Sequence, residues 1–350
     1  MTVLTPAAMA AAAPSGPPRR FPRRGTYLAL LGTRAGPPIQ MDRFGIGSAL
    51  VVDGATYVVD CGRGVASQYI RAGLTLASLE AIFLTHLHAD HVADYYNFFM
   101  LGASAANTLG DVLTGPVDVY GPGPAGALPA PFGGGDPGTV ASEAPTPGTA
   151  ALTADCHRAY AYSTNLFMRD SGMPDIRTLM NVHEIQLPDV GAVPLTHKAP
   201  RMQPFVVMED ERVKVTAVLV PHGPVFPSFA FRFDTDHGSV TFSGDTTYTE
   251  NIPTLAHGSD ILVHEAINLD GASLPSALYE HMLESHVEVQ KVGHIAQASQ
   301  APHLILSHIG DLGTETIDTR LWRRAARAGY DGQVTVGEDL QHFALGARRR

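Results

Sequence analysis

The stretch from Phe83 to His91 reads FLTHLHADH, and it places three histidines and one aspartate directly after an apolar run. That run, residues 81–84, predicts a buried strand. Side chains alternate along an extended chain, so His86 and His88 point the same way. The aspartate and the third histidine follow where a helix over residues 92–99 is expected to begin. Imidazole and carboxylate ligands divided in this way suit two adjacent cations, with zinc expected and iron or manganese as alternatives.

Length, charge and hydropathy limit what kind of protein this is. The chain has 350 residues, 45% of them hydrophobic, which is enough to bury a large core. Its net charge of -10 indicates an acidic surface that repels phosphate backbones. We therefore expect a small-molecule substrate and no nucleic-acid partner, with a local basic patch as the open alternative. No apolar run approaches the ~20 residues that span a membrane, so no membrane partner is expected.

The cysteines and the N-terminus bear on location. Cys61 and Cys156 are too few for a disulfide framework, which favours a reducing, cytoplasmic compartment. Residues 1–24 are rich in alanine and proline and are interpreted as a disordered lead. This lead has no basic residue before Arg19 and no strong apolar stretch, unlike a secretory signal. An atypical export signal is the alternative. A homodimer is the expected assembly.

A change of composition divides the chain. Glycine, proline, alanine and threonine dominate residues 124–149, and an expected helix over 152–169 leads into an irregular run. We interpret residues 124–201 as an insertion into one domain that spans residues 25–350. Insertions of this length are often lids or binding arms, and a disordered spacer is the alternative.

Further polar residues recur in one context, the C-terminal end of an expected apolar strand. They are His222 after 218–221, Asp245 after 240–242, Glu265 after 261–264 and His308 after 304–306. Each alone is equally explained as a turn, cap or core residue. Sites are built in loops at the strand ends of rigid scaffolds, so the shared position favours one common site. The strands fall into two halves, each followed by helices, which predicts an α/β fold of two sheets packed face to face.

The motif at residues 85–91, THLHADH, resembles the signature of the metallo-β-lactamase superfamily. Further motifs resemble its ribonuclease Z and arylsulfatase-like branch, in order: LGT at 31–33 with Arg43 and Ser48, VDCG at 59–62 with Gly64, SGDT at 243–246, VHEA at 263–266, ESH at 284–286 and LSH at 306–308. The resemblance covers roughly residues 27–122 and 205–340. It implies a four-layer αββα metallo-β-lactamase sandwich with a two-metal site between the sheets.

This resemblance also implies a set of metal ligands. They are His86, His88 and His222 for one metal, Asp90, His91 and His308 for the second, and Asp245 as the bridge. Two divalent ions, expected to be Zn²⁺ with Mn²⁺ or Fe²⁺ as alternatives, would generate a metal-bound hydroxide as the nucleophile.

Three residues carry the catalytic roles that the resemblance implies. His286 would not bind metal but would protonate the leaving group, and Glu265 would fix its tautomer and raise its pKa. Asp90 counts as catalytic as well as a ligand. Asp60, after an early strand, either orients a ligand or ends a turn.

The sequence therefore predicts a dinuclear metal-dependent hydrolase that cleaves an ester-type bond of a small molecule: a phosphodiester, sulfate ester, carboxylic ester or lactone. The first alternative is a ribonuclease Z-like tRNA 3'-processing endonuclease. The ribonuclease branch carries a basic arm that grips tRNA, whereas the insertion here has few basic residues among acids and prolines. The second alternative is a redox or non-catalytic metal protein on the same fold.

Overall fold

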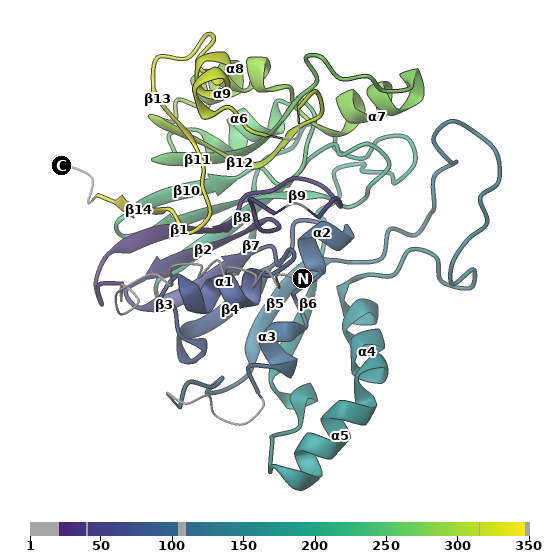
Figure 1. The fold of residues 1–350 in the computed structure, drawn as a ribbon, viewed down its shortest axis with the longest axis vertical. Helices are drawn as coiled ribbons and strands as arrows, with labels where there is room; N and C mark the ends of the chain where they lie inside the picture. The colour runs from purple at the N-terminus through teal and green to yellow at the C-terminus, as the bar shows by residue number, and fades with distance from the viewer. Residues whose placement is uncertain (1–20, 40, 104–109, 315, 347–350) are drawn as a thin grey trace, which may run out of the picture.

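The apolar runs of the chain form two seven-stranded β-sheets (Figure 1). This computed structural model describes residues 21–39, 41–103, 110–314 and 316–346. Most of the predicted N-terminal lead, residues 1–20, lies outside the described residues.

The two sheets are each part antiparallel and part parallel. In spatial order, the first sheet contains β14 (His342–Leu345), β1 (Thr26–Gly32), β2 (Gly47–Val52), β3 (Ala55–Val59), β4 (Leu79–Phe83), β5 (Val117–Pro122) and β6 (Met180–Ile185). The second sheet contains β13 (Gln333–Val336), β12 (His303–Asp311), β11 (Ile261–Asn268), β10 (Gly238–Phe242), β9 (Phe229–Thr235), β8 (Val213–Leu219) and β7 (Phe205–Glu209). Strands β3 to β6 and β10 to β13 run parallel, so their C-terminal ends meet along common edges.

Helices cover the outer faces of the sheets (Figure 1). They are α1 (Val65–Arg71), α2 (Ala89–Val92), α3 (Asn97–Met100), α4 (Thr149–Ala159), α5 (Ala161–Asp170), α6 (Asn251–Ala256), α7 (Ser276–Ser285), α8 (Val289–Ala298) and α9 (Thr319–Ala326), with short 3₁₀ turns at Leu76–Ser78 and Ile176–Thr178. Helix α1 packs on β1, and α6, α8 and α9 pack on the second sheet. The predicted αββα sandwich is confirmed.

Aromatic packing joins the layers. Phe83 of β4 meets Phe231 and Phe233 of β9 at ring-centroid distances of 5.6 and 5.0 Å, which locks the two sheets together. On the outer side of the first sheet, Tyr69 packs edge-on against Phe98 at 5.4 Å. Burial of large aromatic surfaces is the main source of stability in such layers. The strand that leads into the histidine-rich motif is therefore held on both faces.

The segment interpreted as an insertion is partly a strand of the first sheet. Residues 180–185 form β6, which pairs with β5 in parallel and closes that edge of the sheet. The chain between these strands holds a long loop and then α4 and α5, which extend from the same edge (Figure 1). The single helix expected over 152–169 is broken at Tyr160. Composition does not indicate pairing between strands that are distant in sequence. For this reason the predicted insertion, residues 124–201, includes β6.

The residues that the structure describes contain no helix that is both long and apolar enough to cross a lipid bilayer. A single chain is present, and the homodimer stays a prediction.

Candidate metal centre

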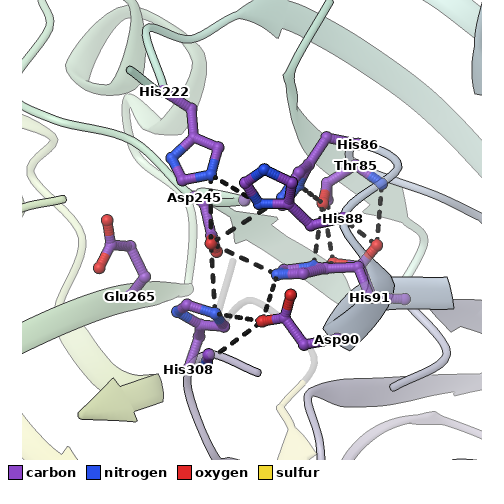
Figure 2. Close-up of polar contacts among 12 residues, drawn as sticks. Thr85, His86, His88, Asp90, His91, His222, Asp245, Glu265 and His308 are labelled. Carbon is purple, nitrogen blue, oxygen red and sulfur yellow. Dashed lines mark hydrogen bonds and ion pairs between the residues drawn. The ribbon is translucent and has the colours of Figure 1, made fainter. Parts of the chain in front are cut away.

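The motif that follows β4 lies where the ends of both sheets meet. The carbonyl oxygen of Thr85 accepts a hydrogen bond from the backbone N–H of Phe229, at 3.0 Å, and this ties the motif to the second sheet. The chain then turns into the short helix α2, so His86 and His88 precede the helix while Asp90 and His91 lie in it. Figure 2 shows the side chains of the motif converging with His308 of β12, with Asp245 from the loop after β10 and with His222 from the loop after β8.

The candidate ligand atoms include two groups of three. Within each group, the three atoms lie within 4.8 Å of one another. The first group is His86, His88 and His222, and the second is Asp90, His91 and His308. In the first group, His222 Nε2 is 3.2 Å from His88 Nδ1. In the second, Asp90 Oδ2 is 3.5 Å from His308 Nε2 and 3.6 Å from His91 Nε2. The structure thus brings together the two sets that the resemblance implies.

The buried carboxylate of Asp245 connects the two groups. Its Oδ2 lies 3.2 Å from His308 Nε2 and 3.3 Å from His91 Nε2 in the second group, and 3.7 Å from His222 Nε2 in the first. Figure 2 shows it in the middle of the cluster. One carboxylate within reach of both groups is the arrangement that a bridging ligand requires.

Three of the imidazoles are each held at one ring nitrogen from outside the cluster. His86 Nδ1 is 3.1 Å from the hydroxyl of Thr85, His91 Nδ1 is 2.9 Å from Asp60 Oδ2, and His222 Nδ1 donates to the carbonyl oxygen of Ser285 at 2.9 Å. The other nitrogen, Nε2, is left for the cluster. Such outer contacts fix the tautomer and orientation of metal-binding histidines. Asp60 therefore orients His91 and does not merely end a turn.

Two of these outer contacts were missed by the sequence reasoning. Thr85 stands directly before the first histidine, so its place in the motif was a usable signal. The contribution of Ser285 is a backbone carbonyl, which any residue supplies, and no residue-type pattern could have revealed it.

Two imidazoles of the cluster are held neutral, whereas burial lowers the pKa of His91 but the Asp245 and Asp60 carboxylates raise it well above its usual value. Burial lowers the pKa of His222 to about 3, and burial together with neighbouring His91 and His222 holds the pKa of His86 well below its usual value. Neutral imidazole is the form that binds metal. Burial raises the pKa of Asp245, but His308 and His91 lower it more, so its carboxylate is ionised.

Three buried polar atoms at the centre make no hydrogen bond within the described residues. They are His86 Nε2, His91 Nε2 and Asp245 Oδ1. Buried polar atoms nearly always have a partner, and an unpaired one calls for an explanation such as a bound ion. The donor set of neutral imidazoles and carboxylates is the one that zinc, iron and manganese take. The residues present therefore fit a metal centre.

The backbone is strained at two points around the cluster, and a glycine occupies a third position of positive φ. Asp60 and His308 have φ of 60° and 59°, a left-handed conformation that residues other than glycine rarely adopt. Gly244, just before Asp245, has φ of 58°, and a Cβ there would lie 2.3 Å from the carbonyl oxygen of Phe229. Strain of this kind persists only where the surroundings enforce it, and it gathers at functional sites.

Glu265 and His308 do not follow strand ends as predicted but lie inside β11 and β12. The pairing of these strands shifts there, because His264 faces Leu306 while Ala266 faces Ile309. One extra residue on β12 thus makes a bulge, and bulges re-aim side chains next to active sites. The apolar runs of β11 and β12 are interrupted at the bulge, so the sequence predicted that both strands end there. The hydrogen-bonded pairing of the two strands nevertheless continues beyond the bulge.

His286 lies beside the cluster and is paired with Glu265. Its Nδ1 is 3.1 Å from Glu265 Oε1, and its ring is 5.0 Å from that of His222. Burial lowers the pKa of His286, but the Glu265 carboxylate outweighs this and raises it to about 9. The imidazole is thus protonated at neutral pH, and its role as the proton donor stays a prediction. Its ligand atoms also fall within 4.8 Å of those of His222 and Asp245, so distance alone allows a ligand role too.

Comparison with known proteins agrees with this geometry. The family model described as "Metallo-beta-lactamase superfamily" matches residues 42–98. Ribonuclease Z of Mycobacterium bovis (strain BCG / Pasteur 1173P2) is 28% identical over 328 residues, which cover 92% of this chain and 99% of that protein. The predicted resemblance to the metallo-β-lactamase superfamily, in its ribonuclease Z branch, is confirmed.

Solved structures of this superfamily share the fold. The metallo-beta-lactamase fold protein YhfI from Bacillus subtilis has a TM-score of 0.60 at 17% identity, covering 92% of this chain and 99% of that one. Human tRNase Z, short form, has a TM-score of 0.58 at 20% identity, covering 91% and 99%. The superfamily binds metal ions, and the present member is a metal-dependent hydrolase.

The expectation of a small-molecule substrate, with nucleic acid excluded, is wrong. The relatives that match nearly the whole chain are ribonucleases Z, and one structural neighbour is a tRNase, both named for nucleic-acid substrates. The expectation rested on the net charge of -10. That sum averages over the whole surface and does not report the local field at any one face.

An apolar cavity of about 250 Å³ adjoins this metallo-β-lactamase centre at His88. Leu87, Leu128, Val225 and Phe226 are among its lining residues, so part of the wall comes from the loop after β5. The same loop reaches across to α7, where Phe132 packs against His281 at 4.9 Å. The apolar lining suits an uncharged group next to the metal centre, and not a phosphate.

Replacing the carboxylate that orients His91 should weaken metal binding without unfolding the protein. Asp60→Asn keeps a residue that tolerates the left-handed backbone, but it leaves His91 Nδ1 without its charged partner. Loss of such an orienting contact typically costs ~10–100-fold in metal affinity. A competition titration with a chelator measures this.

The matched control for this prediction is Asp53→Asn, in the turn between β2 and β3. Asp53 also has positive φ, at 50°, but it contacts Gly25 and His237 on the surface. The control should bind metal as the parent does. Unchanged affinity in Asp60→Asn would show that Asp60 serves only the turn.

Proposed function

We propose that this chain is a ribonuclease Z-like endonuclease that hydrolyses a phosphodiester bond at the 3' end of tRNA precursors. The observation that carries the proposal is the joint geometry of the site. Two ligand groups share Asp245, and the His286–Glu265 pair stands next to them. The names of the relatives, ribonuclease Z over nearly the full length of the chain, support the same substrate class.

Under this proposal the seven clustered residues hold two divalent metal ions. His86, His88 and His222 would hold one ion, Asp90, His91 and His308 would hold the other, and both would share Asp245. Zinc is the proposed metal, because imidazole nitrogens dominate the set. A carboxylate with histidines on either side is a donor that two neighbouring ions would share.

The protein and the metals divide the chemistry. Bound metal ions make a water molecule nucleophilic at neutral pH and stabilise charge on the phosphate. Hydrolysis joins the water oxygen to phosphorus and breaks the bond from phosphorus to a ribose oxygen. That leaving oxygen needs a proton, and His286 supplies it. Glu265 holds His286 Nδ1 at 3.1 Å, which leaves Nε2 as the nitrogen that carries the mobile proton.

Glu265 is itself firmly placed. Its Oε1 also accepts hydrogen bonds from the backbone N–H groups of Thr246 and Val287, at 3.1 and 3.3 Å. The carboxylate thus connects the loop that carries Asp245 with the segment that carries His286. A general acid must be held within reach of the oxygen it protonates. The contacts of Glu265 fix the position of His286 relative to Asp245.

A tRNA precursor with a 3' trailer tests the proposal directly. The zinc-loaded protein should cut it once, at the junction of the tRNA body and the trailer, and should leave the mature tRNA intact. Bis(p-nitrophenyl) phosphate, an activated phosphodiester, reports separately whether the metal centre is assembled. A protein that hydrolyses the activated diester but leaves the precursor uncut would refute the RNA substrate.

A further inference from the structure

Helix α9 has one buried and one strongly basic side. Trp322 and Ala326 are buried against the second sheet, with 2% and 0% of their surface exposed. The exposed side carries arginines at positions 320, 323, 324 and 327. The spacing i, i+3, i+4 and i+7 places all four on the same side of the helix. We call this set of four side chains the arginine face.

The arginine face has no acidic partner within the part of the chain that the structure describes. None of the four guanidinium groups forms a hydrogen bond or ion pair there, whereas Arg158, Arg177 and Arg232 each pair with an aspartate. Asp318, the one acid at the start of the helix, uses its carboxylate to cap the backbone N–H groups of Arg320 and Leu321.

Uncompensated arginines are unfavourable for the isolated protein. Like charges at i, i+3 and i, i+4 repel one another and destabilise a helix. In a chain with a net charge of -10, acidic side chains were available to offset them. The arrangement is therefore the one expected of a surface whose counter-charge is supplied by another molecule.

The helix is fastened to the strand that carries one of the clustered residues. The indole N–H of Trp322 donates to Asp311 Oδ2 at 3.2 Å. Asp311 is the last residue of β12, three residues beyond His308. The first turn of α9 thus lies at the C-terminal end of β12, the strand that carries His308. In Figure 1, α9 lies with α8 in the outer layer over the second sheet.

The segment between β5 and β6, together with the loop that follows β6, is a poor candidate for gripping RNA. Residues 124–201 carry five basic and seven acidic residues. Its exposed arginines include Arg158 and Arg177, which are neutralised by Asp155 and Asp175. Positive charge available to a polyanion is therefore more concentrated on α9 than on this segment.

We propose that the arginine face of α9 binds the sugar–phosphate backbone of the RNA substrate, outside the metal centre. This inference rests on the proposed function. Guanidinium groups bind phosphate oxygens in a bidentate manner and hold an RNA without reading its sequence. An anionic membrane is a poorer fit, because a membrane-bound amphipathic helix inserts its apolar side, and the apolar side of α9 is already packed inside the protein.

The test neutralises the arginine face and a matched set elsewhere. One variant combines Arg320→Gln, Arg323→Gln, Arg324→Gln and Arg327→Gln. The matched control combines Arg158→Gln, Arg169→Gln, Arg177→Gln and Arg201→Gln, which are equally exposed. Glutamine and arginine have similar helix propensities, so both variants should keep the parent's thermal unfolding transition.

The readout is the precursor tRNA concentration that half-saturates single-turnover cleavage by the zinc-loaded enzyme, measured between 50 and 200 mM salt. Each phosphate contact contributes ~0.7–0.9 to the log–log salt slope. Four lost contacts should lower the slope by about 3, and half-saturation at the lowest salt should need at least about tenfold more RNA. The saturating cleavage rate and the hydrolysis of bis(p-nitrophenyl) phosphate should not change.

Each contrary outcome has a distinct meaning. If the α9 variant keeps the parent's slope, or if the control loses as much, the arginine face is not the RNA contact. If the parent binds phosphatidylserine vesicles, and the α9 substitutions abolish this while RNA cleavage is unaffected, the face is a membrane contact and the proposal is wrong. If the parent cuts no precursor while it hydrolyses the activated diester, the proposed function itself has failed.

Discussion

Asp245→Ala should abolish hydrolysis and remove metal at the same time. The carboxylate of Asp245 lies within 3.2–3.7 Å of histidines from both ligand groups, so its loss affects two ions and not one. Contacts that merely orient a metal ligand are worth ~10–100-fold in metal affinity. Loss of a shared ligand should exceed that range for both ions. Metal content measured by elemental analysis should fall well below that of the parent, which under the proposed function is two ions per chain.

The substitution should do this without unfolding the protein. The Asp245 side chain makes no hydrogen bond at Oδ1, and Oδ2 contacts only histidines of the cluster. Removing it also removes the ionised group that holds the pKa of His91 high against burial. The folded chain should therefore tolerate alanine there, and circular dichroism and thermal unfolding in the absence of metal should match the parent.

Asp236→Ala is the matched control. Asp236 is an exposed aspartate in the turn between β9 and β10, outside every candidate ligand group. It should keep both metals and full activity. If Asp245→Ala retains two ions per chain, the bridging assignment is wrong, and the two groups must be linked by another ligand.

His286→Ala should keep both metals but lose most of the rate on RNA. The ribose oxygen that leaves during RNA cleavage is a poor leaving group and needs a proton in the transition state. Removal of a general acid typically costs about 10²–10⁴ in rate. Nitrophenolate is stable without a proton, so hydrolysis of bis(p-nitrophenyl) phosphate should slow much less. The difference between the two substrates, measured on the same preparation, is the expected result.

The pH dependence gives a second, independent readout of His286. A general acid acts in its protonated form, which for His286 is the imidazolium. Burial lowers the pKa of His286, but the Glu265 carboxylate outweighs this and raises it to about 9. Cleavage of RNA by the parent should decline as the pH rises through the pKa of this group. That basic limb should be missing in His286→Ala.

His294→Ala serves as the control, since this histidine is exposed on α8 and belongs to no candidate ligand group. It should cleave both substrates as the parent does. If His286→Ala loses one metal, His286 is a ligand. If both substrates slow equally with both metals in place, His286 positions the substrate and the acid lies elsewhere.

The ligand types and the αββα architecture were readable from the chain alone. Residues 85–91 concentrate their donors within one strand end and one helical turn, so local geometry already aims them at a common point. The two sets of apolar strands, each followed by helices, allow few arrangements that bury both apolar faces. The position after apolar runs made His222, Asp245 and His308 candidates, a family resemblance assigned them as ligands, and the structure places all three within the cluster.

The contacts that complete the site could not be read in this way. The carbonyl of Ser285 that holds His222 has no side-chain signature. The bulge between β11 and β12 that aims Glu265 and His308 depends on a pairing between strands, which the sequence of neither strand encodes alone. Likewise, β6 becomes a strand of the first sheet because β5 offers it an edge.

Charge shows the same division between sequence and tertiary structure. Composition alone determined the net charge of -10, and from it followed the mistaken exclusion of nucleic acid. Only the folded chain shows that Arg320, Arg323, Arg324 and Arg327 share one exposed side of α9 while Trp322 is buried on the other. Net charge is a sum over residues and is independent of the fold. The field that a partner meets depends on which charges lie side by side, and that is decided by packing.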